Sequence, residues 1–212
     1  MSPDASPGPG QIAGLVLAAG ESSRMGQDKA LLIYRGRTFL ETIVAKLRES
    51  GIAHLAVVLG HHAGAIREAL DLAGIQVVIN QQYRSGQTSS LQAGLSALAA
   101  PASPAAHSVG PQAVVLCLVD HPAFEPATVR ALMATFERTR SPVVIPTYNG
   151  RRGHPVLIAQ ALFAPLLALA PSEGANTLFR AWREQTEFVE VADPGILVDV
   201  DNPDAYRALS SS

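Results

Sequence analysis

Apolar runs and amphipathic segments alternate along most of the chain. Five short runs, rich in aliphatic and β-branched residues, are apolar at successive positions. Strands that are buried on both faces of a parallel sheet have this pattern. We therefore predict strands over residues 12–18, 55–60, 75–80, 113–119 and 142–146.

Helical periodicity fills the intervals between these strands. One helix is predicted to begin with a capping box formed by Thr38 and Glu41 and to end at Gly51. Another is predicted to run from Pro126, a favourable first residue, to residue 139. Two further helices are predicted over residues 65–74 and 88–100. This alternation predicts right-handed crossovers and a doubly wound sheet.

Beyond residue 146 the regular alternation ends. The turn-rich segment TYNGRRGHP precedes two helical segments, near residues 159–169 and 175–184. Predicted strands over 188–192 and 196–200 follow, and then a short helix from Pro203. The predicted fold is α/β: a three-layer α/β/α sandwich whose sheet is mostly parallel with a small antiparallel portion.

Composition narrows the functional classes. The 212 residues suit one domain, expected over residues 12–212 after a disordered tail at 1–11, with a surface loop at 101–111. A net charge of −2 lacks the basic excess of a nucleic-acid-binding protein. No apolar run approaches the about 20 residues that cross a bilayer. The single cysteine, Cys117, excludes an internal disulfide and lies in an apolar run as a buried residue. We expect a cytoplasmic protein with no membrane or nucleic-acid partner.

The loop AAGESSRMGQDK follows the first predicted strand. Gly20 and Gly26 allow the backbone to bend towards a ligand, while Arg24 and Lys29 supply positive charge at the carboxyl end of a strand. These features suit a polyphosphate. The dinucleotide pattern G-x-G-x-x-G and the Walker pattern are both absent. The alternative is an ordinary turn with solvated charges.

The stretch LAAGESSRMGQDK resembles the signature L-A-A-G-x-S-x-R-M-G-x-x-K of the MobA-like nucleotidyltransferases, which share a Rossmann-like fold. It is most similar to the molybdenum cofactor cytidylyltransferase branch. The resemblance implies that this loop holds a nucleoside triphosphate, with Arg24 and Lys29 on its phosphates in catalytic roles. It also implies nucleotide contacts by Leu17, Ala18, Ala19 and Gly20.

A second segment, NQQYRSGQTSSLQAGL, resembles the family stretch N-x-x-[YW]-x-x-G-x-x-x-S. By this resemblance Gly86 and Ser90 seat the base and the ribose. The alternative is that Ser89 or Ser90 caps the helix that starts there.

Three acids are candidate metal ligands. Asp120 ends a buried strand within the sequence D-H-P, which fits the family's D-x-P, and a carboxylate there suits Mg²⁺. Asp199 and Asp201 lie two residues apart, so both side chains of an extended segment point to one face. The resemblance favours Asp201 as the second metal ligand, with Asp199 close behind. The alternative for all three is turn capping.

The segment GRRGHP resembles the branch's G-x-x-G-H-P, which is associated with the acceptor substrate. The resemblance places Gly153 and His154 at the acceptor, and Arg151 and Arg152 can meet a phosphate; the alternative is an exposed basic hairpin. The pair His61-His62 lacks a third ligand at a recognisable spacing, so we interpret it as a strand-end loop near the base.

Together these resemblances imply a Mg²⁺-dependent transfer of CMP from CTP to the phosphate of molybdopterin, with release of pyrophosphate. The product is then the cofactor of a molybdenum hydroxylase that receives it. Transfer from GTP, transfer to a sugar 1-phosphate and a non-catalytic carrier or maturation chaperone for the molybdenum cofactor are the alternatives. A carrier needs no complete metal site, so the combination of Lys29, Asp120 and Asp201 favours an enzyme.

Overall fold

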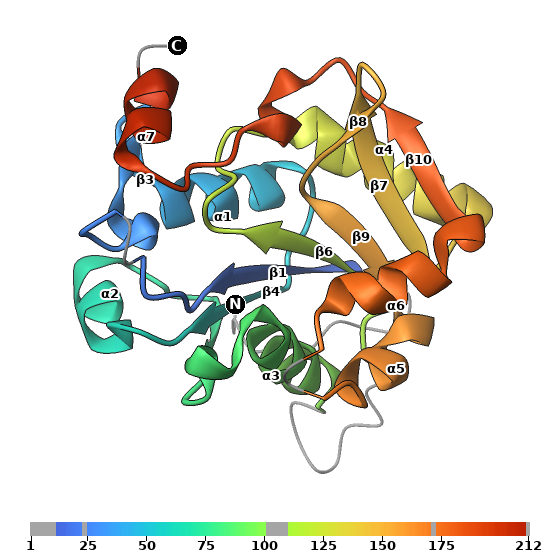
Figure 1. The fold of residues 1–212 in the computed structure, drawn as a ribbon, viewed down its shortest axis with the longest axis horizontal. Coiled ribbons are helices and arrows are strands. Elements are labelled where there is room, and N and C mark those ends of the chain that lie inside the picture. Colours follow the sequence, from blue (N-terminus) through green and yellow to red (C-terminus); the bar gives the residue numbers. More distant parts are fainter. Residues whose placement is uncertain (1–11, 23–24, 101–109, 171–172, 211–212) are drawn as a thin grey trace.

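The computed structural model describes residues 12–22, 25–100, 110–170 and 173–210 (Figure 1). The predicted tail at 1–11, most of the predicted loop at 101–111 and the predicted phosphate ligand Arg24 lie outside the described residues. Within the described ranges, no helix combines the length and the apolar composition needed to cross a membrane.

A mixed sheet of eight strands forms the centre of the described structure. The order is β10 (Thr186–Glu190), β7 (Val143–Tyr148), β9 (Val156–Ala159), β6 (Ala113–Leu118), β1 (Ile12–Ala18), β4 (Leu55–Leu59) and β5 (Gln76–Ile79), with β8 (Arg151–Arg152) paired to β7. The neighbouring strands β6, β1, β4 and β5 are parallel to one another, and β10 is parallel to β7. Strand β9 is antiparallel to both β6 and β7, so the predicted small antiparallel portion is confirmed.

Helices cover both faces of this sheet, which confirms the three-layer sandwich (Figure 1). Helices α1 (Phe39–Glu49) and α4 (Pro126–Thr139) pack on one face, and α3 (Gln87–Ala99) and α5 (Phe163–Leu167) on the other. Successive residues of β1 alternate between these two cores, because Val16 joins the first and Leu15 the second. The remaining described helices are α2 (Ala63–Ala69), α6 (Ala175–Ala181) and α7 (Pro203–Ser210).

Local signals placed several helix ends correctly. Thr38 and Glu41 form the predicted capping box of α1, and Pro126 occupies the first turn of α4. Cys117 is 1% exposed, and burial raises the pKa of its thiol. A ribbon of β2 (Ile33–Tyr34) and β3 (Arg37–Thr38) precedes α1 and was not predicted.

The predicted strand over residues 196–200 is wrong. The chain instead forms the 3-10 helix η5 (Pro194–Leu197) and then an irregular segment. Ile196 and Val200 are fully buried, which explains the apolar pattern that suggested a strand. Asp193 stabilises the 3-10 turn by accepting a hydrogen bond from the Gly195 N–H at 2.9 Å. An apolar run can therefore be buried without joining the sheet.

Candidate active site

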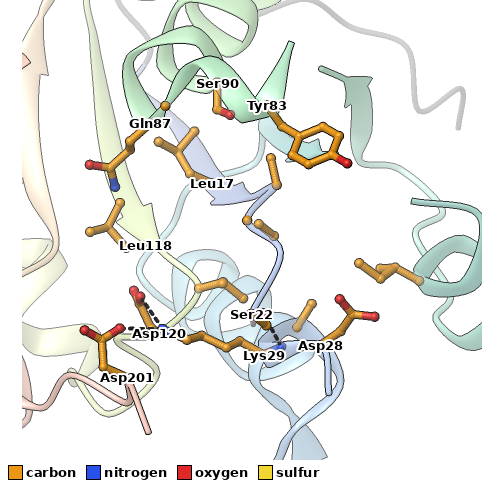
Figure 2. Close-up of a pocket in the computed structure, with 17 residues that line it drawn as sticks. Leu17, Ser22, Asp28, Lys29, Tyr83, Gln87, Ser90, Leu118, Asp120 and Asp201 are labelled. Carbon is orange, nitrogen blue, oxygen red and sulfur yellow. Dashed lines mark hydrogen bonds and ion pairs between the residues drawn. The ribbon is translucent and has the colours of Figure 1, made fainter. Parts of the chain in front are cut away.

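A cavity of about 350 Å³ opens where β1 and β6 end (Figure 2). Ligands of open α/β sheets bind in crevices at the carboxyl ends of strands. The predicted nucleotide-binding residues that the structure describes all line this cavity, and Arg24 lies outside the described residues. They are Leu17, Ala18, Ala19, Gly20, Lys29, Gly86 and Ser90, and the acids Asp120 and Asp201 join them.

The ammonium group of Lys29 lies between two carboxylates (Figure 2). Its Nζ donates to Asp201 Oδ1 at 2.6 Å and to Asp120 Oδ2 at 3.0 Å. The Lys29 N–H also donates to Ser22 Oγ at 3.1 Å, which ties the 3-10 helix η1 (Lys29–Leu31) to the preceding loop. Burial lowers the pKa of Lys29, but the hydrogen bonds and charges of Asp201 and Asp120 outweigh it, so the pKa is raised. Lys29 is therefore a cation at neutral pH.

The two carboxylate oxygens of Asp120 have different surroundings. Oδ2 accepts from Lys29, whereas Oδ1 is buried and has no hydrogen-bond partner in the described part of the chain. Nε2 of His121 lies 3.9 Å from this Oδ1. One potential ligand atom each from Asp120, His121 and Asp199 lie within 4.8 Å of one another. Burial, and next the negative charge of Asp120, raise the pKa of Asp199.

These residues fit a divalent cation. The unpartnered Asp120 oxygen would become a ligand of a bound ion, and the ion would offset the clustered negative charge. Asp201, which the resemblance favoured as the second ligand, pairs with Lys29, while one carboxylate oxygen of Asp199 lies within 4.8 Å of an Asp120 oxygen. The assignment of Asp199 or Asp201 as second ligand remains a prediction.

The segment that carries the later acids is attached to the loop that carries Asp120. The Val200 N–H donates to the Asp120 carbonyl at 3.0 Å. The buried Asp193 carboxylate accepts from the Glu125 N–H at 2.7 Å and from Thr128 Oγ1 at 2.6 Å. Asp193 therefore caps α4 from another part of the chain and joins the two acid-bearing segments.

Gly86 and Ser90 lie at the start of α3. Gly86 has a φ of 108°, a conformation that favours glycine, and no side chain caps the helix. Ser90 is 4% exposed and accepts from Asn80 Nδ2 at 2.9 Å, as does Ser89. The alternative that Ser89 or Ser90 caps α3 is therefore wrong, and both hydroxyls belong to a buried network beside the cavity.

Tyr83 and Gln87 also line the cavity, although no role was predicted for them. Tyr83 is the aromatic residue of the N-x-x-Y-x-x-G stretch, and Gln87 directly follows its glycine, so their place in the motif could have indicated a role in the site. His61 Nδ1 lies 3.2 Å from the Tyr83 hydroxyl, and the ring centroids of His61 and His62 lie 3.7 Å apart with the rings tilted by 35°. Among the described residues the histidine pair belongs to no cluster of three metal-ligand side chains.

A second cavity, of about 670 Å³, adjoins the first. Its described lining carries three arginines, Arg152, Arg180 and Arg183, against one acid, Glu173, so it suits an anionic ligand. Apolar residues such as Phe188 supply the rest of its wall, and the Arg152 guanidinium lies over the Phe188 ring at 4.7 Å. Four residues line both cavities: Leu17, Gly86, Gln87 and Leu118.

The predicted acceptor residues Gly153 and His154 lie in the wall of this second cavity. A Cβ on Gly153 would lie 2.3 Å from the Ile196 carbonyl oxygen, so only glycine permits this approach of two backbones. Burial, and next the nearby His121, lower the pKa of His154 to about 4, so the ring is neutral at neutral pH. Arg151 is exposed and does not line the cavity.

Comparison with known proteins identifies the family. Residues 14–187 match the MobA-like NTP transferase domain. The chain belongs to this family.

Two curated relatives extend over nearly the whole chain. The nicotine blue oxidoreductase of Paenarthrobacter nicotinovorans is 30% identical over 211 residues, covering 93% of this chain and 96% of the relative. The molybdenum cofactor cytidylyltransferase of Escherichia coli K12 is 24% identical over 193 residues, covering 91% and 92%. The crystal structure of Rv0371c from Mycobacterium tuberculosis H37Rv superposes with a TM-score of 0.81 at 32% identity, covering 96% of this chain and 98% of that one. A second structure of Rv0371c is a complex with manganese. This MobA-like chain is thus a member of a nucleotidyltransferase family and shares the fold of Rv0371c.

Proposed function

We propose that this nucleotidyltransferase joins CMP from CTP to the phosphate of molybdopterin and releases pyrophosphate. One observation carries the proposal: a Lys29–Asp120–Asp201 cluster borders a cavity that shares its wall with a second, arginine-lined cavity. A donor nucleotide in the first cavity and an anionic acceptor in the second would meet at that shared wall. The similarity to the molybdenum cofactor cytidylyltransferase of E. coli supports the choice of both substrates.

In this reaction an oxygen of the acceptor phosphate forms a bond to the α-phosphorus of CTP, and the bond to the pyrophosphate oxygen breaks. No covalent intermediate with the protein is needed, so catalysis rests on positioning and on compensation of charge. Lys29 supplies a fixed positive charge beside the cavity, and Arg24 is proposed to act with it on the triphosphate. Arg152, Arg180 and Arg183 would orient the acceptor beside the backbone of Gly153 and the neutral ring of His154.

A divalent ion held by Asp120 with Asp199 or Asp201 would supply positive charge to the phosphate oxygens. The unpartnered Oδ1 of Asp120 supports an ion at this place, and the manganese complex of Rv0371c supports a divalent ion in this family. We propose Mg²⁺ as the ion during turnover.

The test uses the purified chain with Mg²⁺, each of the four NTPs in turn, and molybdenum-loaded molybdopterin or a sugar 1-phosphate as acceptor. We expect pyrophosphate release only with CTP and the pterin, with the cytosine dinucleotide identified by mass spectrometry. Equimolar CTP and GTP in competition measure the choice of base. A product pool dominated by guanine dinucleotide would show that the donor is GTP. A sugar nucleotide as product would show that the acceptor is a sugar 1-phosphate.

Binding of the pterin without pyrophosphate release from any NTP would point to a carrier. Oxidoreductase activity towards nicotine blue, in the absence of nucleotidyl transfer, would point to the reaction class in the name of the Paenarthrobacter relative. Asp120→Asn is the matched inactive control, because it is nearly isosteric and removes one ionised group from the site.

A further inference from the structure

The imidazole of His121 lies beside the proposed metal site and has no part in the reaction described above. Its side chain is 13% exposed, and its Nδ1 is buried without a hydrogen-bond partner in the described residues. The same is true of Oδ1 of Asp120, which lies 3.9 Å from the other ring nitrogen of His121, Nε2. Buried polar groups are almost always paired, so these two adjacent side chains are suited to a ligand from outside the described chain.

The backbone holds these groups in place. The His121 N–H donates to the Leu118 carbonyl at 3.1 Å, so Asp120 and His121 lie in a tight turn at the end of β6. The Val200 N–H donates to the Asp120 carbonyl at 3.0 Å, which holds Asp199 beside that turn. Each of the three side chains therefore comes from a fixed backbone, and one ligand atom of each lies within 4.8 Å of the others. Side chains whose ligand atoms lie this close together can converge on a single ion.

We infer that His121 is a third ligand of the divalent ion, together with Asp120 and Asp199, and that it raises the affinity of the site for a transition-metal ion such as Mn²⁺ more than its affinity for Mg²⁺. The inference rests on the proposed function, because that function assigns a cation to these acids. Imidazole nitrogen binds first-row transition metals well, whereas Mg²⁺ selects oxygen ligands. Asp201 is the ion-pair partner of Lys29 and stays outside this ligand set.

The probe is Mn²⁺ added to the chain without nucleotide or acceptor. Electron spin echo spectroscopy of bound Mn²⁺ detects a coordinated histidine nitrogen directly, and continuous-wave spectra give the Mn²⁺ affinity. We expect a nitrogen coupling in the wild type that is lost in His121→Asn, with a Mn²⁺ dissociation constant raised about 10-fold. The dissociation constant of Mg²⁺, measured by competition, should change less than about threefold, because an oxygen ligand replaces the ring.

His62→Asn is the matched control, because His62 lies at the same edge of the sheet with a φ of 53°, a conformation that asparagine tolerates. The nitrogen coupling should persist in this variant. Absence of Mn²⁺ binding, absence of the coupling in the wild type, or its persistence in His121→Asn would each overturn the inference. Because the probe needs no substrate, nitrogen coupling without nucleotidyl transfer would reject only the proposed function, and transfer without the coupling would reject only the role of His121.

Discussion

Lys29 Nζ lies 2.6 Å from Asp201 Oδ1, although 172 positions separate the two residues in the sequence. The same ammonium group lies 3.0 Å from Asp120 Oδ2. One cation of the first loop therefore compensates one acid from the centre of the chain and one from its end. The folding of the signature loop, β6 and the segment before α7 is coupled at this point.

Replacing Lys29 by methionine should reveal that coupling. The two carboxylates would lose their cation, so the free energy of unfolding should fall by about 1–2 kcal/mol in the presence of EDTA. Added Mn²⁺ should restore more stability to Lys29→Met than to the wild type, because the ion would then offset negative charge that Lys29 no longer compensates. Urea unfolding with and without Mn²⁺ measures both effects, and Arg67→Gln, an exposed charge removal on α2, is the control.

The pH dependence of this effect has a definite sign. The pKa of Lys29 is raised in the folded state, so its contribution is complete below the ordinary lysine value of 10.5. The difference in stability between the wild type and Lys29→Met should stay constant from pH 7 to about pH 10 and shrink at higher pH. A difference that shrank on acidification within the neutral range would contradict the ion pair.

We expect the Asp→Asn variants of the three acids in the site to differ in the metal dependence of their activity. Asp120→Asn should lower turnover at least about 100-fold with the fold retained, since it removes charge at the proposed metal and beside Lys29. Asp199→Asn should raise the metal concentration needed for half-maximal activity. Asp201→Asn should lower turnover with little change in that concentration, because Asp201 contacts Lys29. Steady-state rates over a metal titration, with circular dichroism as the folding control, distinguish the three; the reverse pattern would make Asp201 the ligand.

Asp193 should contribute strongly to stability although it lies outside both cavities. It is 6% exposed and accepts hydrogen bonds from Glu125, Thr128 and Gly195. Asp193→Ala would leave these donors without their acceptor, so unfolding free energy should fall by about 2–4 kcal/mol. Thr38→Ala, which removes the ordinary cap of α1, should cost about 1 kcal/mol. Equal losses in both variants, measured by urea unfolding, would contradict the bridging role of Asp193.

Gly153 tests the backbone contact behind the second cavity. A Cβ there would lie 2.3 Å from the Ile196 carbonyl oxygen, so Gly153→Ala must displace η5, which precedes Asp199. We expect lower stability by at least about 1 kcal/mol and weaker binding of the acceptor. Gly64→Ala is the control: this glycine lies in α2 with open space around its Cβ position, and the change should stabilise the chain by about 0.5–1 kcal/mol. Thermal unfolding and acceptor titrations measure both variants.

Most elements of this protein, and the loop after β1 as a candidate nucleotide site, could be predicted from the sequence. The strands follow from the local apolar pattern, and the capping box of Thr38 and Glu41 and the start of α4 at Pro126 follow from contacts within a few residues. Such contacts depend only on local spacing, which a single sequence contains. The signature loop was found in the same way, because its glycines, charges and strand are contiguous.

The contacts between distant groups could not be predicted from the sequence. The pairing of Lys29 with Asp201, the capping of α4 by Asp193, and the convergence of Arg152 with Arg180 on one cavity depend on crossovers between distant strands. The same holds for residues 196–200. Their apolar pattern correctly indicated burial, but whether they join the sheet or form a 3-10 turn depends on which backbone lies beside them. A local apolar pattern indicates which residues are buried but not which distant residues they contact, so these contacts are seen only in the folded structure.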